Sequence, residues 1–170
     1  MSRTVLLIFA SLVALAVPAC GADLVGRASV VDGDTIEIHG NRIRLFGIDA
    51  PEAAQVCRDA GGKDYRCGQI AANALADYLE GKTVTCAARE LDQYGRTVAI
   101  CTASNLDIGD WLVRRGLAIE YAYYSKGKYR AAQDEASKAH LGLWSGEFIE
   151  PRYFRSCMKT GRLPSVCSTH

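Results

Sequence analysis

The chain has 170 residues, of which 49% are hydrophobic, and its 20 lysines and arginines balance 19 aspartates and glutamates. This length favours a single domain whose core is large enough to be stable by itself. The formal net charge of +1 excludes a protein that holds nucleic acid through its overall field, so any binding of a polyanion must come from a local site.

Residues 1–22 are typical of a secretory signal peptide. Arg3 provides the basic start, and residues 5–17 form an apolar run that Pro18 ends. Because this run is too short for a comfortable membrane span, we expect a mature chain without a transmembrane segment. A buried first helix is the alternative interpretation.

Small residues would allow cleavage after either Ala19 or Ala22, which predicts a secreted or periplasmic protein. Cleavage in front of Cys20 is the alternative and would leave a lipid-anchored protein, although Pro18 fits a lipoprotein site poorly.

Strand patterns open the mature region. An extended segment over 24–31 comes first, and apolar and polar residues then alternate over 35–38 and over 42–47. Turn residues at 32–33 and at 39–41 separate these segments. We therefore predict three consecutive strands joined by turns.

Helical spacing and further turn residues continue the pattern to residue 140. The remaining predicted elements are helices over 70–79, around 108–112 and over 128–140, and strands over 82–88 and 97–102. Five strands with a helix between the third and the fourth predict an α+β fold that is mainly β: a five-stranded barrel of the oligonucleotide/oligosaccharide-binding (OB) type with three α-helices. We expect this domain to span 23–149.

The C-terminal tail, residues 150–170, has no clear periodicity, and we expect it to be irregular. It is mildly basic, and its role is left open by the sequence. Its cationic residues are Arg152, Arg155, Lys159 and Arg162.

The seven cysteines agree with export, because disulfides persist in oxidising compartments. Cys86 and Cys101 lie at matching distances from one turn, so they could face each other across a hairpin. A zinc site is the weaker alternative, since no Cys-x-x-Cys pair is present. Locality favours three bridges, Cys57–Cys67, Cys86–Cys101 and Cys157–Cys167.

Two short runs carry the residue types that metal-assisted phosphodiester hydrolysis needs. Residues 31–35 and 44–52 combine acidic side chains with Arg44, and residues 92–96 add Arg96 in a turn. Two carboxylates suit a hard cation, two guanidinium groups suit a phosphate, and one further carboxylate can accept a proton. The residues concerned are Asp34, Asp49, Arg44, Arg96 and Glu52.

Each of these residues alone has a structural explanation. Asp34 could cap a turn, Asp49 could begin a loop, and either arginine could form a surface salt bridge. Glu52 could cap the chain beside Pro51. The combination favours a metal site, in which Asp32 either supports the ligands or only forms the turn.

Four motifs occur in an order that resembles the staphylococcal nuclease family, over about residues 24–144. They are Val31-Asp32-Gly33-Asp34-Thr35-Ile36, Arg44-Leu45-Phe46-Gly47-Ile48-Asp49-Ala50-Pro51-Glu52, Asp92-Gln93-Tyr94-Gly95-Arg96 and Leu112-Val113-Arg114-Arg115-Gly116-Leu117-Ala118. The resemblance implies a five-stranded barrel and a calcium-dependent nuclease that acts on DNA and RNA and releases 3′-phosphorylated products.

The resemblance also implies a role for each site residue by its position in these motifs. Asp34 and Asp49 correspond to the carboxylate ligands of calcium, and Ala50 to a ligand that uses its backbone carbonyl. The best-known member has threonine at that point, a difference that should be harmless because the main chain would bind the ion. The other implied roles are a phosphate clamp of Arg44 and Arg96 and a general base, Glu52.

Several tyrosines are candidates for stacking on a nucleic-acid base, a contact worth about 1–3 kcal/mol. We select Tyr94, which lies beside Arg96 in the sequence, together with Tyr123 and Tyr124. Ordinary packing is the alternative for part of the cluster, which also contains Tyr121 and Tyr129.

We therefore expect a monomeric nuclease with calcium as its cofactor, DNA or RNA as its substrate and no stable protein partner. The alternative is a non-catalytic module that binds nucleic acid or protein on the same barrel, because a fold alone does not determine function. A binding module has no need of Arg44, Glu52 and Arg96 together beside two carboxylates.

Overall fold

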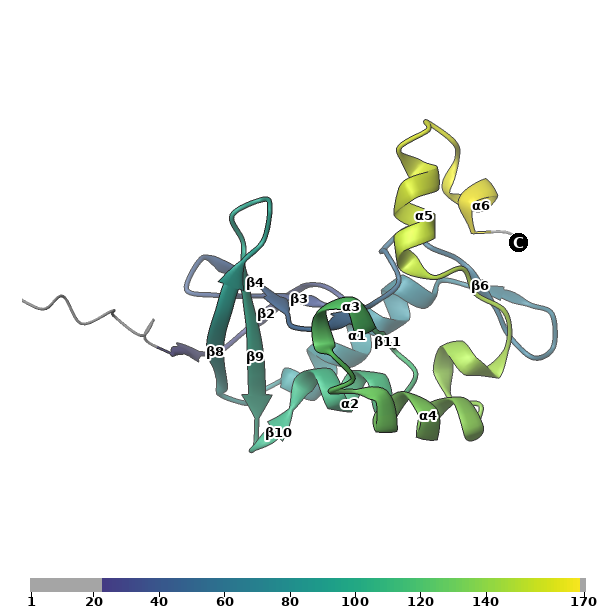
Figure 1. Cartoon of the computed structure of the whole chain (residues 1–170). Helices are drawn as coiled ribbons and strands as arrows, with labels where there is room; N and C mark the ends of the chain where they lie inside the picture. Colours follow the sequence, from purple (N-terminus) through teal and green to yellow (C-terminus); the bar gives the residue numbers. More distant parts are fainter. Residues whose placement is uncertain (1–22, 169–170) are drawn as a thin grey trace, which may run out of the picture.

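The structure is a computed structural model that describes residues 23–168 (Figure 1). The predicted signal peptide and Cys20 lie outside the described residues. No helix in the described part of the chain is long and apolar enough to cross a membrane.

A curled sheet forms the core, with strand order β1-β8-β9-β4-β3-β2. Neighbouring strands run antiparallel except β4 and β9, which are parallel. A short strand, β10 (Leu106–Asp107), extends from β9. The main strands are β1 (Leu24–Gly26), β2 (Ser29–Asp32), β3 (Thr35–Ile38), β4 (Asn41–Leu45), β8 (Val84–Leu91) and β9 (Thr97–Ala103).

The segment 24–31, predicted as one strand, is divided into β1 and β2, which lie at opposite edges of the sheet. Only Arg27 and Ala28 separate the two strands. The sheet therefore has to curl until its edges approach, as in an OB-type barrel. Among the described residues no ladder joins β1 to β2, so hydrogen bonds between the edge strands do not close the sheet, and only the chain connects its two edges.

The alternation predicted for the strands places their apolar side chains inside the barrel. Ile36 and Ile38 of β3 and Ile43 and Leu45 of β4 are all buried. Helix α1 packs along β2, and Leu75 joins this core from the helix. Polar residues that alternate with these, Glu37 of β3 and Arg42 and Arg44 of β4, are not buried and face away from the core.

The described residues form more helices than the three predicted. The predicted helices correspond to α1 (Cys67–Leu79), α2 (Ile108–Arg114) and α4 (Arg130–Lys138). The prediction of an irregular tail is wrong, because the tail forms α5 and α6, and each begins with a proline, whose fixed φ suits the first helical turn. The additional helices are α3 (Ala122–Ser125), the 3₁₀ helix η1 (Gly142–Ser145), α5 (Pro151–Met158) and α6 (Pro164–Cys167).

Two short strand pairs lie outside the main sheet. Strand β5 (Ile48–Asp49) pairs with β11 (Ile119–Glu120) and thereby ties the loop after β4 to the segment after α2. Strands β6 (Cys57–Arg58) and β7 (Asp64–Tyr65) form a hairpin in the loop that precedes α1.

The three disulfides have the pairing predicted from locality. Cys57 is bonded to Cys67, and Cys157 to Cys167. Cys86 and Cys101 are direct partners across β8 and β9, so their bridge crosses the hairpin as expected.

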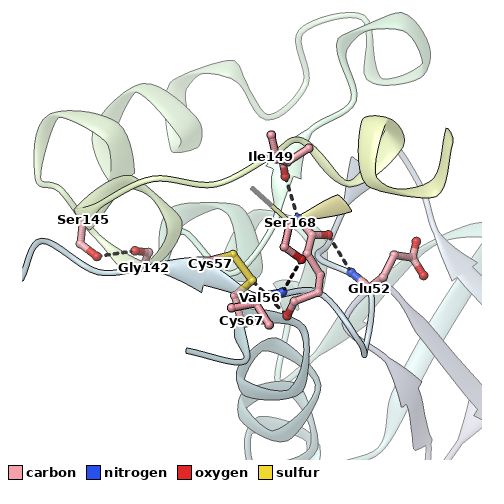
Figure 2. Close-up of a disulfide and its surroundings, with 9 residues drawn as sticks. Glu52, Val56, Cys57, Cys67, Gly142, Ser145, Ile149 and Ser168 are labelled. Atoms are coloured by element: carbon pink, nitrogen blue, oxygen red, sulfur yellow. Dashed lines mark hydrogen bonds between the residues drawn. A yellow bond between two sulfur atoms is a disulfide. The ribbon is translucent and has the colours of Figure 1, made fainter. Parts of the chain in front are cut away.

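Two hydrogen bonds hold the tail against the loop before β6. The N–H of Val56 donates to Oγ of Ser168 at 3.0 Å, and the fully buried Gln55 donates from Nε2 to the carbonyl of Ile149 at 2.7 Å. Figure 2 shows Val56, Ser168 and Ile149 beside the disulfide between Cys57 and Cys67. In Figure 1 helices α5 and α6 lie together above β6, away from β8 and β9. The tail is therefore a packed part of the fold.

Candidate active site

One arginine bridges two buried carboxylates. Nη2 of Arg44 lies 2.7 Å from Oδ2 of Asp34 and 3.0 Å from Oδ1 of Asp49. Only 4% of Asp34 and 2% of Asp49 is exposed. Because a buried charge is costly unless it is paired, the guanidinium of Arg44 offsets part of the cost of burying both carboxylates.

The strands and the turns between them bring these three residues together. Asp34 completes the turn between β2 and β3, and Thr35, which follows it, pairs with Arg44 across β3 and β4. The chain then turns at Gly47, whose φ of +69° is readily adopted only by glycine, and places Asp49 on β5. The three residues thus meet at the start of β3 and the end of β4.

The environment of Asp34 disfavours its negative charge. Burial raises the pKa of Asp34 to about 7, and the nearby carboxylates of Asp32 and Asp49 add to this effect. The guanidinium of Arg44 and the N–H of Ala50 act in the opposite direction but do not outweigh it. Additional positive charge at this place would therefore stabilise the ionised carboxylate.

The donor atoms fit a hard divalent cation. Carboxylate oxygens of Asp34 and Asp49 are the ligands that calcium prefers, and the N–H of Ala50 donates to Oδ2 of Asp34 at 3.3 Å, so the main chain of residue 50 lies beside them. Within residues 23–168 no group of three or more His, Cys, Asp or Glu side chains is arranged to hold a metal. The further ligands would have to be main-chain, water and substrate oxygens.

Glu52 lies next to the carboxylate pair and is joined to it by a residue of the tail. Nη1 of Arg155, on α5, lies 2.8 Å from Oδ1 of Asp49 and 2.8 Å from Oε1 of Glu52. Nη2 of the same guanidinium donates to Oδ2 of Asp49 at 3.0 Å. Glu52 is about one-third exposed and is therefore accessible to solvent, unlike the two aspartates.

The turn that contains Arg96 also holds its side chain in place. Its main-chain N–H donates to Oδ1 of Asp92 at 2.9 Å, and its Nε donates to Oδ2 at 2.7 Å. Burial alone would raise the pKa of Asp92, but hydrogen bonds from Arg96 and Tyr94 outweigh burial and lower it. The carboxylate of Asp92 stays ionised and orients the guanidinium of Arg96 through Nε, which leaves the two Nη groups of Arg96 available.

These side chains share one cavity of about 640 Å³. Arg44 and Glu52 line it on the side of the buried carboxylates, and Arg96 lines it from the β8–β9 turn. The structure therefore brings together the five side chains selected from the sequence: Arg44, Glu52 and Arg96 at the surface of the cavity, and Asp34 and Asp49 behind Arg44.

Only some of the clustered tyrosines line the cavity. Tyr94 and Tyr124 line the cavity, as does Tyr121, which was not selected. Tyr123 is 71% exposed and packs edge-on against Tyr124, but it does not line the cavity. Tyr129 is buried, with its hydroxyl 3.3 Å from Asp107, which makes it a core residue.

Two cationic residues of the cavity were not selected from the sequence. Arg155 and Lys159 come from the tail and reach the cavity because α5 is packed beside the loop that carries Glu52. The available signal was the spacing of four residues between them, which places two side chains on one face of a helix. That signal has meaning only if the tail is helical, and the apolar spacing of Pro151, Phe154 and Met158 that supports a helix there was not recognised.

Comparison with known proteins agrees with this geometry. Residues 42–146 match a family model described as staphylococcal nuclease homologue. The chain is 39% identical over 148 residues to the succinoglycan biosynthesis protein ExoI of Rhizobium meliloti (strain 1021), an alignment that covers 86% of this chain and 78% of that protein.

Two further relatives have names that refer to nucleases. An uncharacterized endonuclease of Escherichia coli is 35% identical over 135 residues, with 75% of this chain and 82% of that protein covered. A micrococcal nuclease of Shigella flexneri is 33% identical over 132 residues, with 68% of this chain and 70% of that protein covered. Together with the matched family model, these similarities show that the chain belongs to the staphylococcal nuclease family.

Proposed function

We propose that the protein is an exported, calcium-dependent nuclease that hydrolyses phosphodiester bonds of DNA and RNA with little sequence preference and leaves 3′-phosphate ends. Its family and the names of its relatives support a hydrolase that acts on nucleic acids. The observation that carries the proposal is the convergence of Arg44, Glu52 and Arg96 on one cavity, in front of two buried carboxylates.

Each side chain has a role that suits its position. Glu52, exposed to the cavity, accepts a proton from the attacking water. Arg44 and Arg96 donate to the phosphate oxygens as negative charge increases in the transition state, and a planar guanidinium can donate two such bonds at once. A calcium ion held by Asp34, Asp49 and the carbonyl of Ala50 would supply charge neutralisation at the same phosphate.

Export is supported by the three disulfides of the described chain, because such bonds persist in oxidising compartments. The predicted signal peptide at residues 1–22 would direct this export. We place the mature protein outside the cytoplasm, secreted or in a periplasm.

Digestion of plasmid DNA and of RNA tests the proposed function. We expect both substrates to be degraded in calcium, to remain intact when a chelator is added, and to be degraded again when calcium is restored. Binding of either substrate without degradation in calcium would favour the alternative, a non-catalytic binding module. Equal degradation with and without chelator would contradict the metal site.

Gly68, at the start of α1, offers a test of how Glu52 is positioned. A Cβ at this residue would lie 1.8 Å from the carbonyl oxygen of Glu52, so an alanine has to displace the loop. We expect Gly68→Ala to lower kcat by about 10²-fold, the typical effect of misplacing a catalytic group by about 1 Å. Steady-state kinetics with a thermal unfolding control measure this effect.

Gly61→Ala is the matched control in the preceding hairpin. Its Cβ would approach only the side chain of Asp59, at 3.3 Å, so kcat should be unchanged. A Gly68→Ala protein with the kcat of the wild type would mean that the position of this loop does not matter for catalysis.

A further inference from the structure

The tail contributes two of the cations that line the cavity. Arg155 lies in the last turn of α5 and Lys159 follows its end with helical backbone angles, so the two side chains lie on the same face. The other cations of the lining are Arg44 and Arg96, which come from the barrel. The tail therefore supplies two of the four cationic side chains that the described residues contribute to the cavity.

The position of α5 is well defined by its packing. Phe154 is 2% exposed, and Pro151 is buried as well. The bridge between Cys157 and Cys167 joins α5 to α6, and Ser168 after α6 accepts the hydrogen bond from Val56 described above (Figure 2). A cation carried by this helix is held beside Glu52 instead of moving freely in solvent.

Arg155 retains donors that its carboxylate partners do not use. Its side chain is one-third exposed, and its bonds to Asp49 and Glu52 use both hydrogens of Nη1 and one of Nη2. No hydrogen bond from Nε or from the second Nη2 hydrogen is present among the described residues. The guanidinium can therefore donate to a phosphate oxygen and keep its hydrogen bonds to Asp49 and Glu52.

Lys159 is the cavity cation that is most available to a ligand. It is exposed, and it forms no ion pair with any residue in the range that the structure describes. Arg44, Arg96 and Arg155 are each engaged by carboxylates. An exposed, unpaired ammonium beside a site for phosphodiester chemistry suits a second phosphate of the same strand.

The charge balance of the chain makes such local cations necessary. With 20 basic and 19 acidic residues, long-range attraction cannot hold a nucleic acid. The cavity lining itself includes the acidic residues Asp32, Glu52, Glu90 and Asp92, which repel a polyanion. Cations from outside the barrel are therefore required to hold the phosphates on either side of the bond that is cut.

We propose that α5 is part of the nucleic-acid-binding surface, with Arg155 and Lys159 contacting substrate phosphates that neighbour the scissile one. The assignment rests on the proposed function, because it takes a nucleic-acid strand as the ligand of the cavity. It gives the disulfide-linked tail a direct part in substrate binding.

Salt-dependent binding tests this role without catalysis. A fluorescein-labelled oligothymidylate is titrated with the full mature protein in chelator, and fluorescence anisotropy gives Kd over a range of salt concentrations. Each phosphate contact on a single strand contributes about 0.7 to the slope of log affinity against log salt. We expect Lys159→Gln to reduce the slope by about 0.7 and the double variant Arg155→Gln/Lys159→Gln to reduce it by about 1.4. For the double variant, a tenfold dilution of salt would then raise the affinity about 25-fold less than it does for the wild type.

Arg162→Gln and Lys138→Gln are the matched controls. Both remove an exposed cation that does not line the cavity, and the slope should stay at the wild-type value. Lys159→Gln removes no ion pair within the described chain, so it remains informative even if Arg155→Gln, which removes the ion pairs with Asp49 and Glu52, unfolds the protein.

The outcomes separate the two proposals. Wild-type slopes in the Lys159 and double variants of a protein that binds and cleaves would overturn the role of α5 and leave the nuclease assignment intact. Absence of salt-dependent binding by the wild-type protein would also overturn the role of α5, whereas the nuclease assignment is overturned only if the protein fails to degrade DNA and RNA in calcium.

Discussion

Arg96→Lys is expected to lower kcat by about 10²–10³-fold while the protein remains folded. In the structure Nε of Arg96 is held by Asp92 at 2.7 Å, and the two Nη groups stay available for phosphate. An ammonium has a single nitrogen, which cannot both keep the bond to Asp92 and donate a planar pair to the substrate. Initial rates at saturating substrate measure the loss, and circular dichroism checks the fold.

Arg42→Lys is the control for this substitution. Arg42 lies on β4 two residues before Arg44, is 64% exposed in its side chain and pairs only with Glu37 at 3.6 Å among the described residues. Its replacement should leave kcat unchanged. Near-normal turnover by Arg96→Lys would rule out the clamp role, because the clamp depends on the guanidinium group and not on charge alone.

Glu52→Gln is expected to lower kcat by about 10²–10⁴-fold, the usual contribution of a general base. Glutamine keeps the shape of the side chain and an oxygen that can accept from Arg155, so the local structure should persist. The loop is also held through the main chain, where the N–H of Glu52 donates to Oε1 of Gln55 at 3.2 Å. The pre-steady-state rate of the cleavage step measures the effect without contributions from product release.

Glu90→Gln removes the same charge from the same cavity, but at a residue on β8 that has no hydrogen bond or ion pair with Asp34 or Asp49 in the part of the chain that the structure describes. We expect this variant to cleave at least as fast as the wild type, because it removes repulsion from the substrate without removing the base. Equal losses in the Glu52 and Glu90 variants would mean that charge in the cavity, and not proton transfer, explains the effect of Glu52.

The sequence predicts the barrel well because its signals are local. Alternation along β3 and β4 and the turns between them determine which side chains enter the core, and these patterns are visible in single segments. The disulfide between Cys86 and Cys101 was predictable for the same reason, since a hairpin determines which residues face each other. The break between β1 and β2 was not predictable, because both halves have the same extended pattern and differ only in the partner strand.

The candidate site was only partly predictable, for a similar reason. Asp34, Arg44 and Asp49 are close in the sequence, and one hairpin with the loop after it brings them together. Arg155 is 106 residues from Asp49 and reaches it only through the packing of α5 against a distant loop. Apolar residues recur at helical spacing in α5, at Pro151, Phe154 and Met158, but a pattern over only two turns is too short to predict a helix that depends on a disulfide and tertiary contacts.

The sequence also does not reveal how burial changes the pKa of a site residue. The pKa of Asp34 is raised to about 7 mainly by burial, which depends on everything packed around the residue. The sequence shows only that a carboxylate is present, whereas the structure shows that it lies beside a second carboxylate with one guanidinium between them.

Analysis of the product ends tests most directly whether this cavity is a metal-dependent nuclease site. A 5′-labelled DNA oligonucleotide is incubated with the wild-type protein in calcium or in chelator, and the fragments are then treated with an enzyme that removes 3′-phosphates. We predict fragments that appear only in calcium and whose gel mobility decreases after this treatment. An oligonucleotide that stays intact in calcium, or the same fragments in chelator, would contradict hydrolysis at this site.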